Sequence, residues 1–105
     1  MILEIAELTL MPGAEAEFLR NAASEVEIFR RAKGCRGMQI RQTPEAPGTF
    51  RLLVLWETLQ NHTVDFRGSD DFTIWRALTV PHYAEPPVIK NWSVALDGFG
   101  FAGLD

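Results

Sequence analysis

The chain has 105 residues, of which 47% are hydrophobic and 23% charged, and its formal net charge is −4. This length and composition are those of one soluble globular domain spanning residues 1–105. Lys and Arg are dispersed rather than clustered, so neither nucleic acid nor an anionic membrane surface is an expected partner. Cys35 is the single cysteine, which excludes an intrachain disulfide and fits a reducing compartment, so we expect a cytoplasmic location.

The first half of the chain predicts a strand, a helix and a second strand. Residues 2–10 alternate apolar side chains as a strand does, and they contain two glutamates and no basic leader, so neither a signal peptide nor a membrane span is expected. Residues 14–32 repeat apolar side chains at helical spacing and predict one helix, with Gly34 as its C-cap. Residues 37–43 predict a short strand, and the turn-forming residues 43–48 predict an antiparallel connection.

The second half predicts a strand, two helices and a last strand. Residues 49–57 give the strongest strand pattern in the chain. Thr58 can cap a short helix, and Ser69 can cap a second one after a break at Gly68. Residues 88–96 then predict the last strand. The Gly-rich tail, residues 97–105, is expected either to be loose or to pack its two phenylalanines on a neighbour.

This order predicts an α+β fold of the ferredoxin-like type, β-α-β-β-α-β, with helices on one face of a four-stranded antiparallel sheet. The run from Leu52 to Trp56 is apolar on both faces of its strand, and such a strand must be covered on both sides. Two helices can cover only one face of the sheet. We therefore predict a homodimer through the open face of the sheet, which would form a dimeric α+β barrel.

Two polar residues, His62 and Arg76, are the predicted carriers of chemistry. His62 lies one turn before Phe66 in a helix expected to be too short to bury it deeply. It is interpreted either as a general base or as a half-buried histidine bonded to a backbone carbonyl. Arg76 can pair with a phenolate or carboxylate, or lie at a rim with its stem over apolar surface. His82 is expected in a surface turn.

Aromatic side chains could line a flat pocket for a small aromatic ligand or substrate, and equally could fill the core of a two-layer domain. The candidates for substrate binding are Trp56, Phe66, Phe72, Trp75 and Trp92. The chain has no GxGxxG, P-loop, HExxH or Cys/His metal pattern, so neither a cofactor nor a metal is expected. Chemistry would then depend on an imidazole, a guanidinium, a dry cavity and a reactive substrate.

The stretch 55–92 resembles the antibiotic biosynthesis monooxygenase (ABM) family. The resemblance extends over nearly the whole chain and rests on Trp56-Glu57, His62, Phe66-Arg67-Gly68-Ser69, Phe72, Trp75-Arg76 and Pro86-Pro87 before the last strand. It implies a dimeric α+β barrel with a cavity between sheet and helices in each protomer. Some members of the family oxidise aromatic polyketide quinols without metal or flavin, and others degrade haem.

The motif of the haem-degrading branch is absent. That branch has Trp, His and Asn where this chain has Phe66, Arg76 and Ala6, so haem degradation is not expected. Two functional classes remain open. One is a cofactor-independent monooxygenase in which His62 removes a phenolic proton and Arg76 stabilises the oxyanion. The other is a non-catalytic homodimer that binds a small ligand or serves a structural role.

Overall fold

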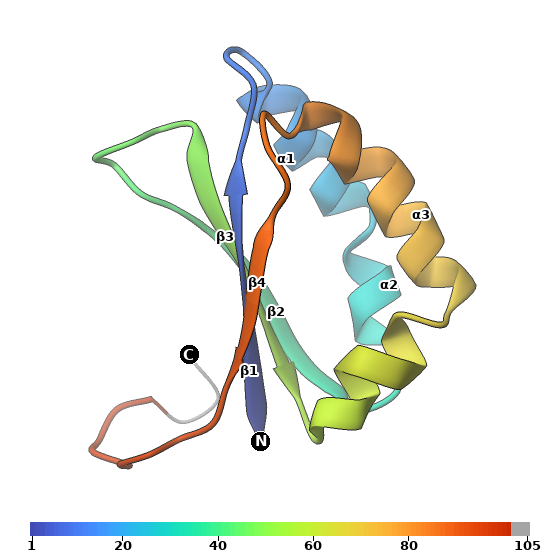
Figure 1. The fold of residues 1–105 in the computed structure, drawn as a ribbon, viewed down its shortest axis with the longest axis vertical. Helices are drawn as coiled ribbons and strands as arrows, with labels where there is room; N and C mark the ends of the chain where they lie inside the picture. Colours follow the sequence, from blue (N-terminus) through green and yellow to red (C-terminus); the bar gives the residue numbers. More distant parts are fainter. Residues whose placement is uncertain (102–105) are drawn as a thin grey trace.

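A computed structural model of the chain describes residues 1–101, which form a four-stranded antiparallel sheet with its helices on one face (Figure 1). The strand order is β2-β3-β1-β4. The strands are β1 (Ile2–Thr9), β2 (Cys35–Gln42), β3 (Thr49–Trp56) and β4 (Val88–Trp92). The helices are α1 (Glu15–Ser24), α2 (Val26–Arg30), the π-helix η1 (Asn61–Phe66), α3 (Asp70–Thr79) and the 3₁₀ turn η2 (Val80–His82). The predicted α+β, ferredoxin-like fold is confirmed.

The core lies between the sheet and the helices. β1 and β3 pair along their full lengths, from Ile2 opposite Trp56 to Thr9 opposite Thr49. Because side chains alternate along a strand, one face of this pair contributes alternate buried residues to the core. The core residues are Ala6, Leu8 and Leu10 from the β1 region, Phe50, Leu52, Val54 and Trp56 from β3, and Phe18, Ala22, Ile28, Phe29, Phe66 and Trp75 from the helices.

The predicted helix over residues 14–32 is in fact two helices. Glu25 interrupts it with φ −113° and ψ 15°, values outside the helical range, and its backbone N–H donates to the Ala22 carbonyl at 3.1 Å. The second helix, α2, packs the adjacent residues Ile28 and Phe29 into the core, where both are buried.

The last strand is shorter than predicted. β4 pairs only with β1, and the pairing ends with Trp92 opposite Leu3, one residue from the start of β1. The chain beyond Trp92 therefore has no neighbouring strand, and Val94 and Leu96 are 71% and 84% exposed instead of occupying a strand face.

No helix within residues 1–101 covers the opposite face of the sheet (Figure 1). Leu3, Ile5, Leu53 and Leu55 point to this open face and are half-buried. The segment after β4 runs away from the helical layer, and its Phe99 and Phe101 are exposed. The rest of the predicted tail, residues 102–105, lies outside the described residues.

Candidate active site

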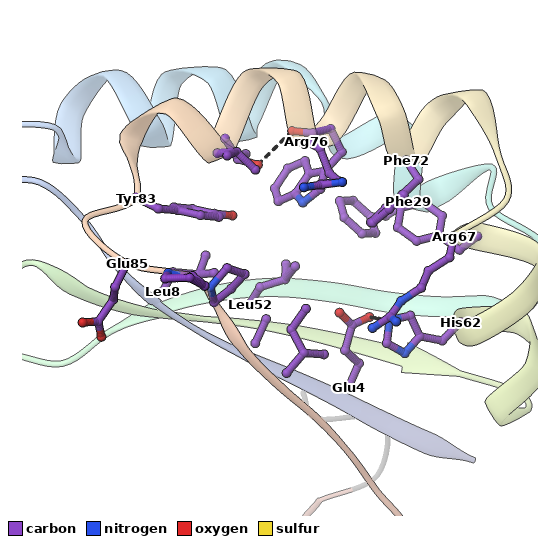
Figure 2. A pocket seen from close by; sticks show the side chains of 18 of the residues that line it. Glu4, Leu8, Phe29, Leu52, His62, Arg67, Phe72, Arg76, Tyr83 and Glu85 are labelled. Atoms are coloured by element: carbon purple, nitrogen blue, oxygen red, sulfur yellow. Dashed lines mark hydrogen bonds and ion pairs between the residues drawn. The ribbon is translucent and has the colours of Figure 1, made fainter.

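A cavity of about 470 Å³ lies between α3 and the covered face of the sheet, with walls from β1, β3, β4, η1 and α3 (Figure 2). This volume is typical of a site for a small ligand. Much of the wall is apolar and aromatic: Ala6, Leu8, Phe29, Leu52, Phe66, Phe72, Trp75, Pro86, Pro87 and Ile89. The polar groups that reach it are few: Glu4, His62, Arg67, Arg76, Thr79, Tyr83 and Glu85.

The π-helix η1 places His62 at one end of this cavity. The Thr58 hydroxyl accepts the backbone N–H of Asn61 at 3.2 Å, and the Asn61 side-chain oxygen accepts the Thr58 N–H at 3.1 Å, which starts the helix. The N–H of Arg67 donates to the His62 carbonyl five residues earlier, at 3.3 Å. This wide turn directs both His62 and Phe66 inward, and Leu59, which an α-helix would place beside them, is 39% exposed.

His62 is 2% exposed, so the expectation that its helix would leave it only partly buried is wrong. Its partners are side chains rather than a backbone carbonyl. Nδ1 lies 2.7 Å from the Asn91 side-chain oxygen, and Nε2 lies 3.3 Å from Oε1 of Glu4. The imidazole also stacks on the Trp56 indole, with ring centres 5.7 Å apart and planes 6° from parallel. Both nitrogens and one ring face are therefore held.

Glu4 is a carboxylate buried on the covered face of β1, where it is 5% exposed. Its Oε1 accepts the indole N–H of Trp56 at 3.0 Å. Burial raises the pKa of Glu4 above its ordinary value, while His62, the Trp56 hydrogen bond and the charge of Arg67 act in the opposite direction. Glu4 and His62 thus form an acid–base pair, with Oε1 and Nε2 3.3 Å apart, in the wall of an apolar cavity.

Arg76 reaches the cavity from α3, a helix that begins where the Ser69 hydroxyl accepts the N–H of Phe72 at 3.1 Å. Its guanidinium carbon lies 5.8 Å from the centre of the Phe72 ring, a cation–π arrangement. The charge of Arg76 favours the ionised form of Tyr83, although burial is the larger effect and raises the pKa of that phenol. Neither Arg67 nor Arg76 forms an ion pair with another described residue, so both cations are available to an anionic group in the cavity.

The structure brings five of the seven predicted site residues together in one cavity: His62, Phe66, Phe72, Trp75 and Arg76. The other two lie elsewhere. Trp56 is fully buried behind His62 and supports the imidazole instead of lining the cavity. Trp92 pairs with Leu3 on the open face and is 51% exposed, so the sheet separates it from the cavity and its predicted place there is wrong.

Several polar groups of the site were not predicted, among them Glu4, Tyr83 and Asn91. The sequence does carry a signal for Glu4, because it is the one charged residue among the alternate positions of β1 that face the core. Asn91 gives no such signal, since it becomes a partner of His62 only through the pairing of β4 with β1. His82, predicted in a surface turn, lies half-buried in η2 with Nε2 3.2 Å from the Asn21 side-chain nitrogen, outside the cavity.

Two further features of residues 1–101 bear on the class of protein. No helix in this range is long and apolar enough to cross a membrane. No group of three or more His, Cys, Asp or Glu side chains in the same range is placed to hold a metal ion.

The sheet order and the cavity beneath α3 define the class as a ferredoxin-like α+β protein with a ligand-sized pocket between its layers. The family model described as "Antibiotic biosynthesis monooxygenase" matches residues 1–78. The chain belongs to this family.

Relatives agree with the assignment. The chain is 33% identical over 92 residues to the uncharacterized protein YczJ of Bacillus subtilis (strain 168), covering 88% of this chain and 97% of that protein. A crystal structure of a Bordetella bronchiseptica protein, named "Putative antibiotic biosynthesis monooxygenase", is 43% identical, with a TM-score of 0.87 over 90% of this chain and 97% of that one. A similarly named Nitrosomonas europaea structure, 18% identical, has a TM-score of 0.79 over 91% of this chain and all of that chain and shows the shared fold.

Proposed function

We propose that this protein is a cofactor-independent monooxygenase that oxidises a small aromatic or quinol-type substrate with molecular oxygen, in the cytoplasm and as a homodimer. The observation that supports this most strongly is the Glu4–His62 pair, a buried acid–base pair 3.3 Å apart in the wall of an aromatic cavity. A buried carboxyl with a raised pKa in a cleft, such as that of Glu4, is typical of active sites. Membership of the family makes oxygenation the reaction class to test first.

In the proposed reaction the pair that contains His62 removes the proton of a phenolic hydroxyl. Arg76 stabilises the resulting oxyanion, since its guanidinium has no anionic partner within residues 1–101. Phe66, Phe72 and Trp75 hold the planar substrate and keep water from the electron-rich ring. The ring carbon then reacts with oxygen. One oxygen atom forms a carbonyl on that carbon and the other leaves as water, so a phenol becomes a quinone without an external reductant.

Oxygen uptake by protein freed of metal tests this function. Hydroxynaphthalenes and anthrols are suitable substrates because they are planar and easily oxidised once ionised. We expect uptake above the rate without protein, reduced at least about tenfold in His62→Ala, because one well-placed acid–base group contributes roughly that much or more.

His82→Ala is the matched control, since His82 is a half-buried histidine that lies outside the cavity, and it should retain the wild-type rate. Equal rates in wild type and His62→Ala would contradict the proposal. Uptake with none of the phenols would favour the alternative, a homodimer of the same fold that binds a small ligand without turning it over.

A further inference from the structure

The proposed function assigns proton removal to the Glu4–His62 pair and leaves open which atom contacts the substrate. The imidazole is poorly placed for direct contact. Both of its nitrogens face protein partners, Asn91 at 2.7 Å and Glu4 at 3.3 Å, and one ring face stacks on Trp56. A base must reach within hydrogen-bond distance of the proton that it accepts. To do so directly, His62 would have to give up one of these partners.

Glu4 presents a free acceptor instead. Its Oε1 takes both contacts, the indole N–H of Trp56 at 3.0 Å and Nε2 of His62 at 3.3 Å. Its Oε2 makes no hydrogen bond to any described residue. Among the described residues no enclosed side-chain oxygen or nitrogen lacks a partner, so Oε2 must be accessible from the cavity that Glu4 lines. Figure 2 shows the Glu4 carboxylate directed upward into that space, beside His62 and Arg67.

We propose that Glu4 is the catalytic proton acceptor: its Oε2 takes the phenolic proton of the substrate, while His62 positions the carboxylate through Oε1. This inference rests on the proposed function and deepens it by naming the acceptor and the substrate group that it recognises, an acidic aromatic hydroxyl. The proton passes from the substrate oxygen to Oε2, which leaves a phenolate and a neutral Glu4 carboxyl.

The charges around Glu4 suit this transfer. The indole N–H of Trp56 donates to Oε1, and His62 and Arg67 lie close enough to favour the ionised form of the Glu4 carboxyl. Transfer of the substrate proton to Oε2 then replaces the carboxylate by a phenolate close to His62 and Arg67. The negative charge moves a short distance among the same polar groups, which avoids the cost of an unpaired buried charge.

The test uses binding of 4-nitrophenol, whose phenol and phenolate forms absorb at different wavelengths, at a pH where the free compound is the neutral phenol. In the wild-type protein we expect the bound compound to be largely phenolate, with no matching release of protons to the solvent, because Glu4 retains the proton. In Glu4→Gln we expect the ratio of bound phenolate to phenol to fall about tenfold or more, equivalent to about one pKa unit.

Two comparison variants sharpen the result. Glu7→Gln removes a carboxylate from the same strand on the opposite face, where it pairs with Arg51, and should leave the ratio unchanged. His62→Gln keeps a polar side chain at that position and should retain bound phenolate, in smaller proportion than the wild type. A ratio that falls in His62→Gln and not in Glu4→Gln would overturn the proposal, as would binding as the phenol, or no binding, by the wild type.

The same proteins separate this inference from the function on which it rests. Phenolate formation that depends on Glu4, in a protein that consumes no oxygen with any phenol, would contradict the monooxygenase and leave the acceptor assigned. Oxygen uptake by Glu4→Gln at the wild-type rate would support the monooxygenase and would exclude Glu4 as the proton acceptor.

Discussion

At the scale of single residues, burial of the ionised Glu4 carboxyl lowers the free energy of unfolding. A buried carboxylate without donors would take up a proton, and hydrogen bonds to charged groups contribute about 1.5–3 kcal/mol each to offset that tendency. Trp56 supplies one such bond at 3.0 Å, and His62 supplies a polar contact at 3.3 Å. The pKa of Glu4 nevertheless stays above its ordinary value, because burial is the larger effect. Glu4 therefore destabilises the folded state in its ionised form.

This balance predicts how stability depends on pH. A carboxyl whose pKa is higher in the folded than in the unfolded state binds more protons when folded, so its contribution to the free energy of unfolding falls as pH rises through the interval between the two values. That interval begins near the ordinary value of 4.5. Glu4→Gln removes the titration, and its stability relative to the wild type should be greater near neutral pH than below pH 4.5.

Urea unfolding of both proteins across this pH range measures the difference directly. Other carboxylates titrate in the same range, such as Asp71, whose pKa is lowered by the hydrogen bonds and charge of Arg31, but they are common to the two proteins and cancel. A difference in unfolding free energy that does not change with pH would contradict the raised pKa of Glu4.

At the scale of elements, the junction between the α2–β2 turn and η1 sets the position of the site. Gly34 has φ +75°, and a Cβ added there would collide with the side-chain amide of Asn61, the first residue of η1. Its carbonyl also accepts the Glu57 N–H at 2.8 Å. The turn and the π-helix thus fit together only with glycine at this position, and the fit fixes the start of the element that carries His62.

Gly34→Ala should therefore destabilise the protein by more than Gly13→Ala. Gly13 has a similar φ of +82° with nothing near its missing Cβ, so alanine there costs only the left-handed conformation, about 1–2 kcal/mol. Gly34→Ala adds the collision with Asn61. Thermal or urea unfolding of the two variants compares them, and equal losses of stability would show that the contact with Asn61 is not a constraint.

The elements also show what the sequence could and could not predict. Alternation and turn-forming residues predicted the four strands, and the cap at Ser69 predicted α3, because those signals are local in the sequence. Spacing could not predict the break at Glu25 or the π-helix, since both depend on how the chain fits its neighbours. The site was limited in the same way, because spacing predicts only local contacts. His62 was predicted as a polar residue one turn before Phe66. Its burial depends on the wide turn of η1 and on Asn91, which lies 29 residues away on another strand. Trp92 was assigned to the wrong side of the sheet because alternation alone does not tell which face is covered.

At the scale of the whole molecule, the open face of the sheet leaves an apolar surface without cover. Leu3, Ile5, Leu53 and Leu55 form its centre, and Trp92 continues it at the β4 edge. Exposed contiguous apolar surface on a sheet is typical of an interface between protein chains. The homodimer remains our prediction, and the open face is the surface to which we assign it.

Light scattering should give a mass of twice 11.8 kDa at micromolar concentration. Leu53→Lys places a charge at the centre of the open face and should shift the protein to the monomer. Thr73→Lys adds the same charge at an exposed position of α3 and should not. This interface would be excluded if the wild type is a monomer, or if the Leu53→Lys variant still has the mass of a dimer.

In the proposed function the cavity carries out an oxygenation with its own side chains and without a cofactor. The most direct test of this function is turnover of an anthrol by protein freed of metal under isotopically labelled oxygen gas, followed by mass spectrometry of the product. We predict one labelled oxygen atom in the quinone formed, with the original phenolic oxygen unlabelled, and loss of that product in His62→Ala. A quinone without label, or the same labelled yield from His62→Ala as from the wild type, would contradict the account.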